Sequence, residues 1–208
     1  EKGKWCISSI TVSYANNLSN ETHPDYGDKC LVFYDEEGNS HVMNFSAMPD
    51  DDRGVFFGET YFYLYTRRNT EPEQLFMPSN TDQEFSQYFN SSNLIKVLTH
   101  GWFSSGSCQW ILNMKDEFLR NYDYNVIIID WSEFARNPVY PWSAYDTRYV
   151  GSKTAQLLDA IAIIYEIDGS YFHLIGHSLG AHVMAHVADL SSLRIHRITG
   201  GCNNKWYW

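Results

Sequence analysis

A serine between two glycines is the residue of this sequence best suited to do chemistry. Ser178 lies in Gly176-His177-Ser178-Leu179-Gly180, which fits the pattern G-x-S-x-G. In that pattern the serine occupies a strained turn between a strand and a helix, and its hydroxyl projects above the edge of a sheet. Gly176 and Gly180 allow the two backbones to approach closely. We therefore predict that Ser178 is the nucleophile of an acyl transfer.

The alternative is a plain turn in which the serine has no chemical role. The flanking segments favour the nucleophile, because a buried strand at 172–175 leads into the turn and an amphipathic helix at 179–190 leaves it.

Acyl transfer also needs two backbone N–H donors for the oxyanion of the tetrahedral intermediate. The residue after the nucleophile, Leu179, supplies one of them in this type of turn. We predict that Trp102 supplies the other, since His100-Gly101-Trp102 follows an earlier strand at 94–99. Without the serine turn, the same three residues would read as an ordinary end to a strand.

Two other polar residues near these motifs are expected to be structural. His100 precedes the nucleophile, whereas the chain order in this kind of site is Ser, Asp, His. We expect His100 to be buried and to hold its loop. Asp130 is also too early in the chain to be the acid of a triad, and we expect it to bond the backbone or the loop at Trp131.

A metal site is not expected. His182 and His186 are four residues apart on the predicted helix, but Val183 stands where a metalloprotease would have glutamate. The cysteines lack the C-x-x-C spacing of a zinc site. We therefore expect neither a metal nor another cofactor.

The elements around these motifs alternate between strand and helix. Strands are predicted at 31–34, 60–66, 94–99, 126–129, 172–175 and 194–199, and helices at 110–119, 150–165 and 179–190. The run Val126 to Ile129 is typical of a parallel strand that is covered on both faces. Such an order predicts an α/β fold with a parallel sheet and right-handed crossovers. Ser and Gly before residue 110 suit a helix cap.

Composition limits the kinds of partner. With 44% hydrophobic and 19% charged residues, the 208-residue chain is long and apolar enough for one folded domain. Its formal net charge of −10 argues against nucleic acid or an anionic membrane as an electrostatic partner. No apolar stretch approaches the ~20 residues of a membrane span.

Sequons favour secretion. Asn17, Asn20, Asn44 and Asn90 each begin one, where roughly two would arise by chance, so they are glycosylation candidates. In an oxidising compartment Cys6 and Cys30 can close a loop as a disulfide, whereas Cys108 is equally well read as a small hydrophobic residue.

Several motifs together resemble the pancreatic-lipase-like family. They are Thr66-Arg67-Arg68-Asn69, His100-Gly101-Trp102, Val126-Ile127-Ile128-Ile129-Asp130-Trp131, His173 through His182 around the serine turn, and Arg197-Ile198-Thr199-Gly200. The N-terminal segment is most similar to that of the secreted insect-type members of the neutral lipase and phospholipase A1 group. The resemblance implies an α/β-hydrolase fold, of which this chain would carry the N-terminal half, and hydrolysis of the carboxylic esters of acylglycerols or phospholipids. By the same comparison, Ser178 is the nucleophile and Trp102 and Leu179 form the oxyanion hole.

On this basis we expect a polar N-terminal extension at 1–54, a partial hydrolase domain at 55–200 and a divergent tail at 201–208. In the family, Arg-Ile-Thr-Gly continues as Leu-Asp-Pro-Ala, and that aspartate is the acid of the triad. Here Gly200 is followed by Gly201 and Cys202. We therefore expect the sequence as given to hold a nucleophile without the acid and base of a triad. Without them, we predict weak activity or none. It also leaves the strand at 194–199 as an uncovered sheet edge.

Two classes of function remain open. The first is a secreted lipase or phospholipase that meets a lipid ester or a lipid interface. The second is a secreted, non-catalytic homologue that binds lipid or a protein partner.

Overall fold

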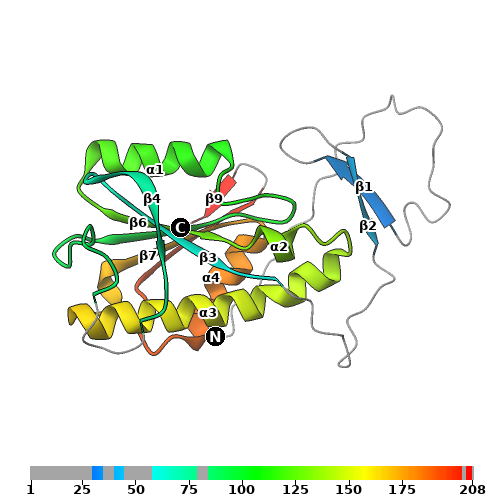
Figure 1. The fold of residues 1–208 in the computed structure, drawn as a ribbon. Helices are drawn as coiled ribbons and strands as arrows, with labels where there is room; N and C mark the ends of the chain where they lie inside the picture. Colours follow the sequence, from blue (N-terminus) through cyan, green and yellow to red (C-terminus); the bar gives the residue numbers. More distant parts are fainter. Residues whose placement is uncertain (1–29, 35–39, 45–57, 79–83, 203–204, 208) are drawn as a thin grey trace.

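A single sheet with helices on both faces forms the body of the molecule (Figure 1). The computed structural model describes residues 30–34, 40–44, 58–78, 84–202 and 205–207. A separate two-stranded hairpin, made of β1 (Cys30–Tyr34) and β2 (Ser40–Asn44), lies beyond the N-terminal end of the longest helix.

In the described part of the chain, seven strands form the main sheet in the order β4-β3-β6-β5-β7-β8-β9. They are β3 (Tyr61–Thr66), β4 (Asn69–Leu75), β5 (Ile95–Thr99), β6 (Asn125–Asp130), β7 (Phe172–His177), β8 (Arg197–Cys202) and β9 (Lys205–Tyr207). The four central strands, β6, β5, β7 and β8, are parallel, and the outer pairings are antiparallel. The predicted α/β fold with a mostly parallel sheet is confirmed.

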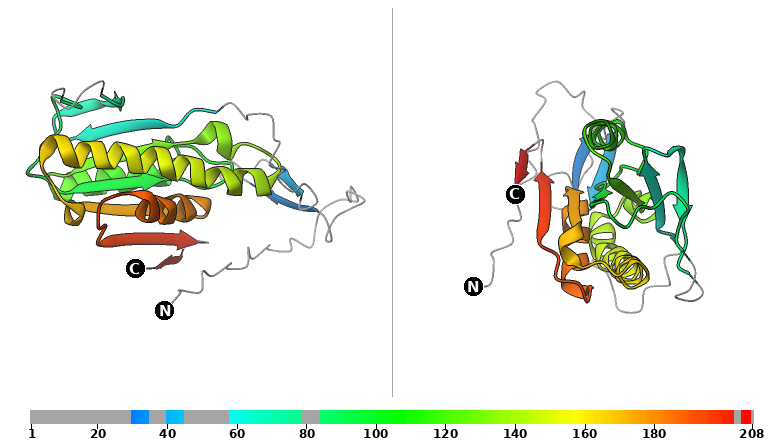
Figure 2. Two further views of the ribbon diagram at one scale, coloured as in Figure 1. Left: turned by 90° about the horizontal axis from the view of Figure 1, so that it is seen from below. Right: turned by 90° about the vertical axis from the view of Figure 1, so that its left-hand side faces the viewer.

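Helices cross between the parallel strands. They are α1 (Gln109–Asn121), α2 (Ser132–Ala135), α3 (Tyr140–Tyr165) and α4 (Leu179–Leu190), and a short 3₁₀ turn covers Gly169–Tyr171. The helix α1 covers one face of the sheet, and α3 and α4 lie together on the other (Figures 1 and 2). The bounds of α4 are those predicted for residues 179–190.

The continuous apolar run in β6 explains why both faces are covered. Successive side chains of a strand point to opposite faces. Ile127 and Ile129 therefore enter the core beneath α3 and α4, whereas Val126 and Ile128 pack on the α1 side. All four side chains are completely buried. In a strand with only one covered face, apolar residues would alternate with polar ones.

Some elements differ from the predictions. The helix α3 begins at Tyr140, ten residues before the predicted start, with Pro141 in its first turn, where proline needs no N–H partner. The polar segment after Thr66 forms a strand, β4, that the sequence did not predict. The expected Ser or Gly cap of α1 was wrong, because Cys108 is its N-cap residue and makes no side-chain capping bond.

The expectation of an uncovered edge at β8 was also wrong. The strand β9 pairs with β8 in antiparallel register, with Gly201 opposite Trp206. Backbone hydrogen bonds do not depend on the identity of the side chains. A short tail can therefore extend a sheet without any sequence pattern that marks it as a strand. The tail therefore continues the sheet.

Candidate active site

The predicted nucleophile has the backbone strain that its role requires. Ser178 joins β7 to α4 with φ 54° and ψ −122°, a backbone conformation that residues other than glycine rarely adopt. Its N–H donates to the carbonyl oxygen of Gly201 at 2.7 Å, which ties the turn to the carboxyl end of β8. The serine is half-buried. The turn is held where the parallel strands end, the edge at which open α/β sheets bind ligands.

The two glycines of the turn are at positions without room for a side chain. A Cβ at Gly176 would lie 2.3 Å from the carbonyl oxygen of Gly180. A Cβ at Gly180 would lie 2.4 Å from the carbonyl oxygen of His100. The strand β7, the helix α4 and the end of β5 therefore meet through backbone contacts around the serine.

The loop after β5 reaches the serine directly. A Cβ at Gly101 would lie 2.8 Å from Ser178 Cβ and 3.4 Å from its Oγ. We give the name oxyanion loop to residues 100–106, because they include the predicted oxyanion donor Trp102. Two hydrogen bonds hold the loop to the end of α2 and the residues after it. Phe103 N–H donates to the carbonyl oxygen of Ala135 at 2.9 Å, and Trp102 Nε1–H donates to that of Asn137 at 2.8 Å.

The predicted oxyanion donors lie on the two elements that meet at the serine. Leu179 is the first residue of α4, so its N–H has no acceptor within the helix. Trp102 is half-buried, and its indole packs edge-on against the ring of Tyr140 at 5.0 Å. Phe103, the next residue, has φ 51°, so the oxyanion loop carries backbone strain as well.

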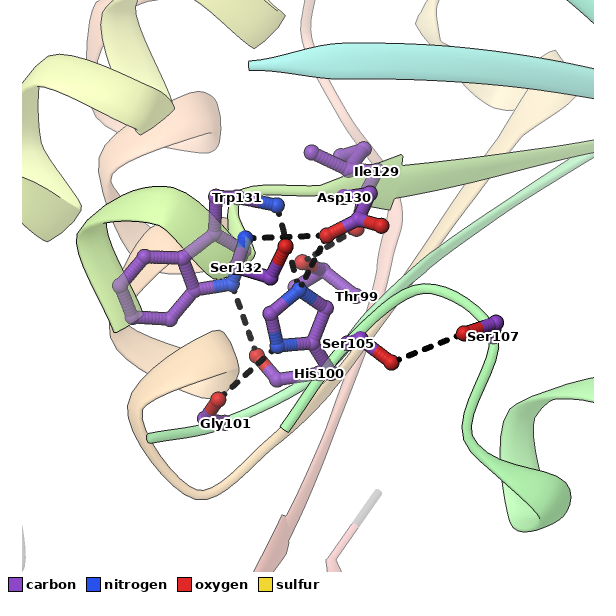
Figure 3. Close-up of polar contacts among 9 residues, drawn as sticks. All are labelled: Thr99, His100, Gly101, Ser105, Ser107, Ile129, Asp130, Trp131 and Ser132. Atoms are coloured by element: carbon purple, nitrogen blue, oxygen red, sulfur yellow. Dashed lines mark hydrogen bonds and ion pairs between the residues drawn. The ribbon is translucent and has the colours of Figure 1, made fainter. Parts of the chain in front are cut away.

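His100 is buried and holds the loop, as its place in the sequence suggested. Its Nδ1 donates to the carbonyl oxygen of Gly101 at 2.9 Å, and the Trp131 N–H donates to its Nε2 at 3.1 Å (Figure 3). Asp130 Oδ1 lies 3.2 Å from the same Nε2 and accepts from the Ser132 N–H at 2.9 Å. This pair was not predicted from the sequence.

Asp130 is held in its charged form. Burial alone would raise the pKa of its carboxyl, but the bond to His100 and the bond to the Ser132 N–H outweigh it and lower the pKa to about 2. A carboxylate with a lowered pKa beside the oxyanion loop is a feature that sequence order alone could not reveal.

The remaining histidines near the serine have other surroundings. His177, within the serine turn, faces the Trp110 ring at 5.4 Å, and burial lowers its pKa. His182 is exposed on α4, whereas His186 is half-buried and burial lowers its pKa. Among the described residues, no group of three or more His, Cys, Asp or Glu is arranged to hold a metal ion.

No side chain in the described part of the chain hydrogen-bonds Ser178 Oγ. The position where the family acid was expected is Cys202, the last residue of β8, and its side chain lies outside the described residues. Among the described residues, the contacts of the serine therefore include no base or acid of a triad.

A parallel sheet with helices on both faces and a strained serine between β7 and α4 defines the α/β-hydrolase class. The chain belongs to the lipase family, and the family model described as Lipase matches residues 30–205. That match begins at β1, within the segment expected to be an extension, and reaches β9.

Related proteins place it within the pancreatic-lipase-like group. Inactive pancreatic lipase-related protein 1 of Canis lupus familiaris is 33% identical over 141 residues, which are 68% of this chain and 30% of that protein. Lipoprotein lipase of Sus scrofa is 32% identical over 145 residues, and pancreatic triacylglycerol lipase of Myocastor coypus is 30% identical over 141. Each alignment covers 68% of this chain and 30% of the relative, so the matched part of the chain spans less than a third of these proteins.

Proposed function

We propose that Ser178 is the nucleophile of a carboxylic-ester hydrolase that acts on acylglycerols or phospholipids. The observation that carries this proposal is the strained backbone of Ser178 in direct contact with Gly101. The strain of holding a serine at φ 54° against a second loop costs on the order of 1–3 kcal/mol, and a turn without a chemical role would be expected to avoid it.

In the proposed reaction, Ser178 Oγ bonds to the carbonyl carbon of the ester and its proton passes to a base. The carbonyl π electrons move onto the oxygen, and the N–H groups of Trp102 and Leu179 donate to the resulting oxyanion. Collapse of this intermediate expels the alcohol, which takes up the proton. Water then hydrolyses the acyl-serine by the same steps.

We expect the chain as given to be weakly active or inactive. In triad enzymes, loss of the base costs on the order of 10⁶ in turnover, and what remains comes from binding and the oxyanion hole. The hydrogen bonds of the described residues bring no base to Ser178 Oγ, and Cys202 stands where the family has its acid.

The experiment is labelling with a fluorophosphonate probe, followed by mass spectrometry of the labelled peptide. We expect slow labelling over hours at Ser178, and none in Ser178→Ala. Ser107→Ala is the matched control, since it removes an exposed hydroxyl from the neighbouring loop. Labelling that persists in Ser178→Ala, or no labelling of the wild-type chain, would reject the nucleophile.

The second candidate is a non-catalytic homologue that binds lipid. Two observations favour it: no described side chain bonds Ser178 Oγ, and one relative carries the word inactive in its name. This function predicts equal binding of wild type and Ser178→Ala to phosphatidylcholine vesicles, without release of fatty acid. Binding that requires Ser178, or measurable release of fatty acid, would contradict it.

Secretion accompanies either function in our proposal. Asn90 is exposed, as a glycosylated asparagine has to be, and its Oδ1 accepts from the Ser92 N–H at 3.0 Å. Asn17 and Asn20 lie outside the described residues, as does the side chain of Asn44. Cys6 also lies outside them, so its disulfide with Cys30 stays a prediction. Of the helices in the described ranges, none has the length and apolarity to cross a membrane.

A further inference from the structure

A charged carboxylate lies beside the proposed active site without a part in the reaction as described. Asp130 is the last residue of β6, and 18% of its side chain is exposed. Taking a carboxylate out of water is costly unless hydrogen bonds compensate it. The hydrogen bonds of the Asp130 carboxylate therefore show which part of the structure it holds in place.

The sheet register places Asp130 beside His100. Thr99 and Ile129 are partners at the ends of the parallel strands β5 and β6, so the next residue of each strand follows at the same level. His100 Nε2 and Asp130 Oδ1 are 3.2 Å apart. The ends of β5 and β6 are thus joined through side chains where the ladder of backbone hydrogen bonds stops.

Trp131 completes this junction. Its N–H donates to His100 Nε2 at 3.1 Å, and its indole Nε1–H donates to the His100 carbonyl oxygen at 3.0 Å. The two rings are stacked, with centroids 5.4 Å apart and an interplanar angle of 13°, and both are completely buried (Figure 3).

The partners of His100 fix the proton on one of its two ring nitrogens. The Gly101 carbonyl oxygen can only accept, so Nδ1 carries a proton. A neutral ring therefore accepts from the Trp131 N–H at Nε2. A protonated ring donates from Nε2 to Asp130 instead. With Asp130 present, His100 has a partner in both states and holds Gly101 in place.

Asp130 also touches the oxyanion loop at its other end. A Cβ at Gly106 would lie 2.9 Å from Asp130 Cβ, so the loop passes directly over this residue. Between these two contacts the loop carries Gly101, which packs on Ser178, and Trp102, the proposed oxyanion donor.

We propose that Asp130, acting through His100, is a positioning residue that sets the distance of the oxyanion loop from Ser178. This inference rests on the proposed function, since it concerns the same oxyanion hole. Preorganised donors act only if they are held where the negative charge develops, and the buried pair supplies that restraint.

The test measures the rate of phosphonylation of Ser178 at saturating probe, kinact, and the probe concentration at half-saturation, KI. We expect Asp130→Ala to lower kinact by roughly 10-fold, below the ~10²–10³ loss of a direct oxyanion donor, with KI within a factor of two. A displaced donor weakens the transition state more than it weakens the complex before reaction.

Asp130→Asn is the conservative variant, because its amide oxygen can still accept from the Ser132 N–H. We expect it to have a kinact between those of Asp130→Ala and the wild type, and it serves as the test variant if Asp130→Ala fails to fold. Asp168→Asn is the matched control. Asp168 likewise accepts from a backbone N–H two residues ahead, that of Ser170 at 2.7 Å, but it lies near the amino end of β7. Its kinact should equal that of the wild type.

The outcomes separate the two proposals. If Ser178 is labelled in the wild type, and folded Asp130→Asn and Asp130→Ala both have the wild-type kinact, the positioning role is overturned. The proposed function then remains intact. A fall in kinact that is matched in Asp168→Asn overturns it as well. A wild-type chain that is not labelled overturns both, because there is then no working oxyanion hole to position.

Discussion

Gly101 and Ser178 are in such close contact that only glycine fits at position 101. A Cβ there would lie 2.8 Å from the serine Cβ and 2.9 Å from the carbonyl oxygen of His177. Both neighbours belong to the rigid turn between β7 and α4, so the oxyanion loop would have to move.

Gly101→Ala tests this contact. We expect labelling of Ser178 to fall by at least ~10²-fold, as for a lost oxyanion donor, and the free energy of unfolding to fall by about 1–3 kcal/mol through overpacking. Probe labelling and urea unfolding measure the two effects. Gly200→Ala is the control, since among the described residues its Cβ would meet only Ala181 Cβ, at an ordinary 3.4 Å. Equal labelling of the two variants would contradict the close contact.

The strain at Ser178 makes a prediction about stability that is separate from catalysis. With φ at 54° and ψ at −122°, Ser178→Gly should be more stable than Ser178→Ala by about 1 kcal/mol. Glycine relieves the strained backbone, and part of that gain is offset by its greater freedom in the unfolded chain. Urea unfolding of the two variants gives the difference. Greater stability of Ser178→Ala would show that the turn is unstrained.

Another residue with positive φ ends α3. Glu166 is exposed, has φ 53° and ψ 43°, and its N–H donates to the carbonyl oxygen of Ala162. Glu166→Gly should raise the free energy of unfolding by about 1 kcal/mol, because glycine adopts this conformation without steric cost. Gln156→Gly, at an exposed position inside the same helix, should lower it by about 1 kcal/mol. Thermal unfolding would reveal the opposite signs, and a shared sign would refute the capping argument.

His173 predicts loss of stability in acid. Its Nδ1 accepts from Lys96 Nζ at 3.4 Å and its Nε2 lies 2.8 Å from Thr199 Oγ1, so the folded ring is neutral. Burial and the nearby charges of Lys96 and Arg197 lower its pKa from 6.5 to about 4. Between these values the unfolded chain binds a proton that the folded chain does not.

Stability from this residue is therefore complete above pH ~6.5 and declines as the pH falls to about 4, by on the order of 3 kcal/mol in total. Urea unfolding at pH 7.5 and 4.5 should show a smaller pH dependence in His173→Asn than in the wild type. His182→Asn removes an exposed histidine of α4 and should leave the dependence unchanged. An unaltered dependence in His173→Asn would exclude this cause.

Local patterns were sufficient for elements that have to bury a regular apolar face. The helix α4 and the strand β6 follow from the spacing of their apolar residues, because burial imposes that spacing. The strand β4 is polar, and β9 is three residues long. Both are held by backbone pairing with a neighbouring strand, which leaves no periodic pattern to read.

The candidate site divides in the same way. Ser178, Trp102 and Leu179 were predicted from short motifs, and their assignment as nucleophile and oxyanion donors awaits the labelling experiments. The pairing of His100 with Asp130 was missed, although each residue was singled out, because 30 residues separate them. Their contact depends on the register of β5 and β6.

The sequence by itself determined the class of fold and the family, and it singled out Ser178 as the proposed nucleophile, since these depend on local spacing and on motifs in a set order. Only the tertiary structure decided that Gly101 lies against Ser178 and that Asp130 lies against His100 and Gly106 of the same loop. Such contacts join the ends of strands that are distant in the chain, and their distances are set by packing of the whole sheet.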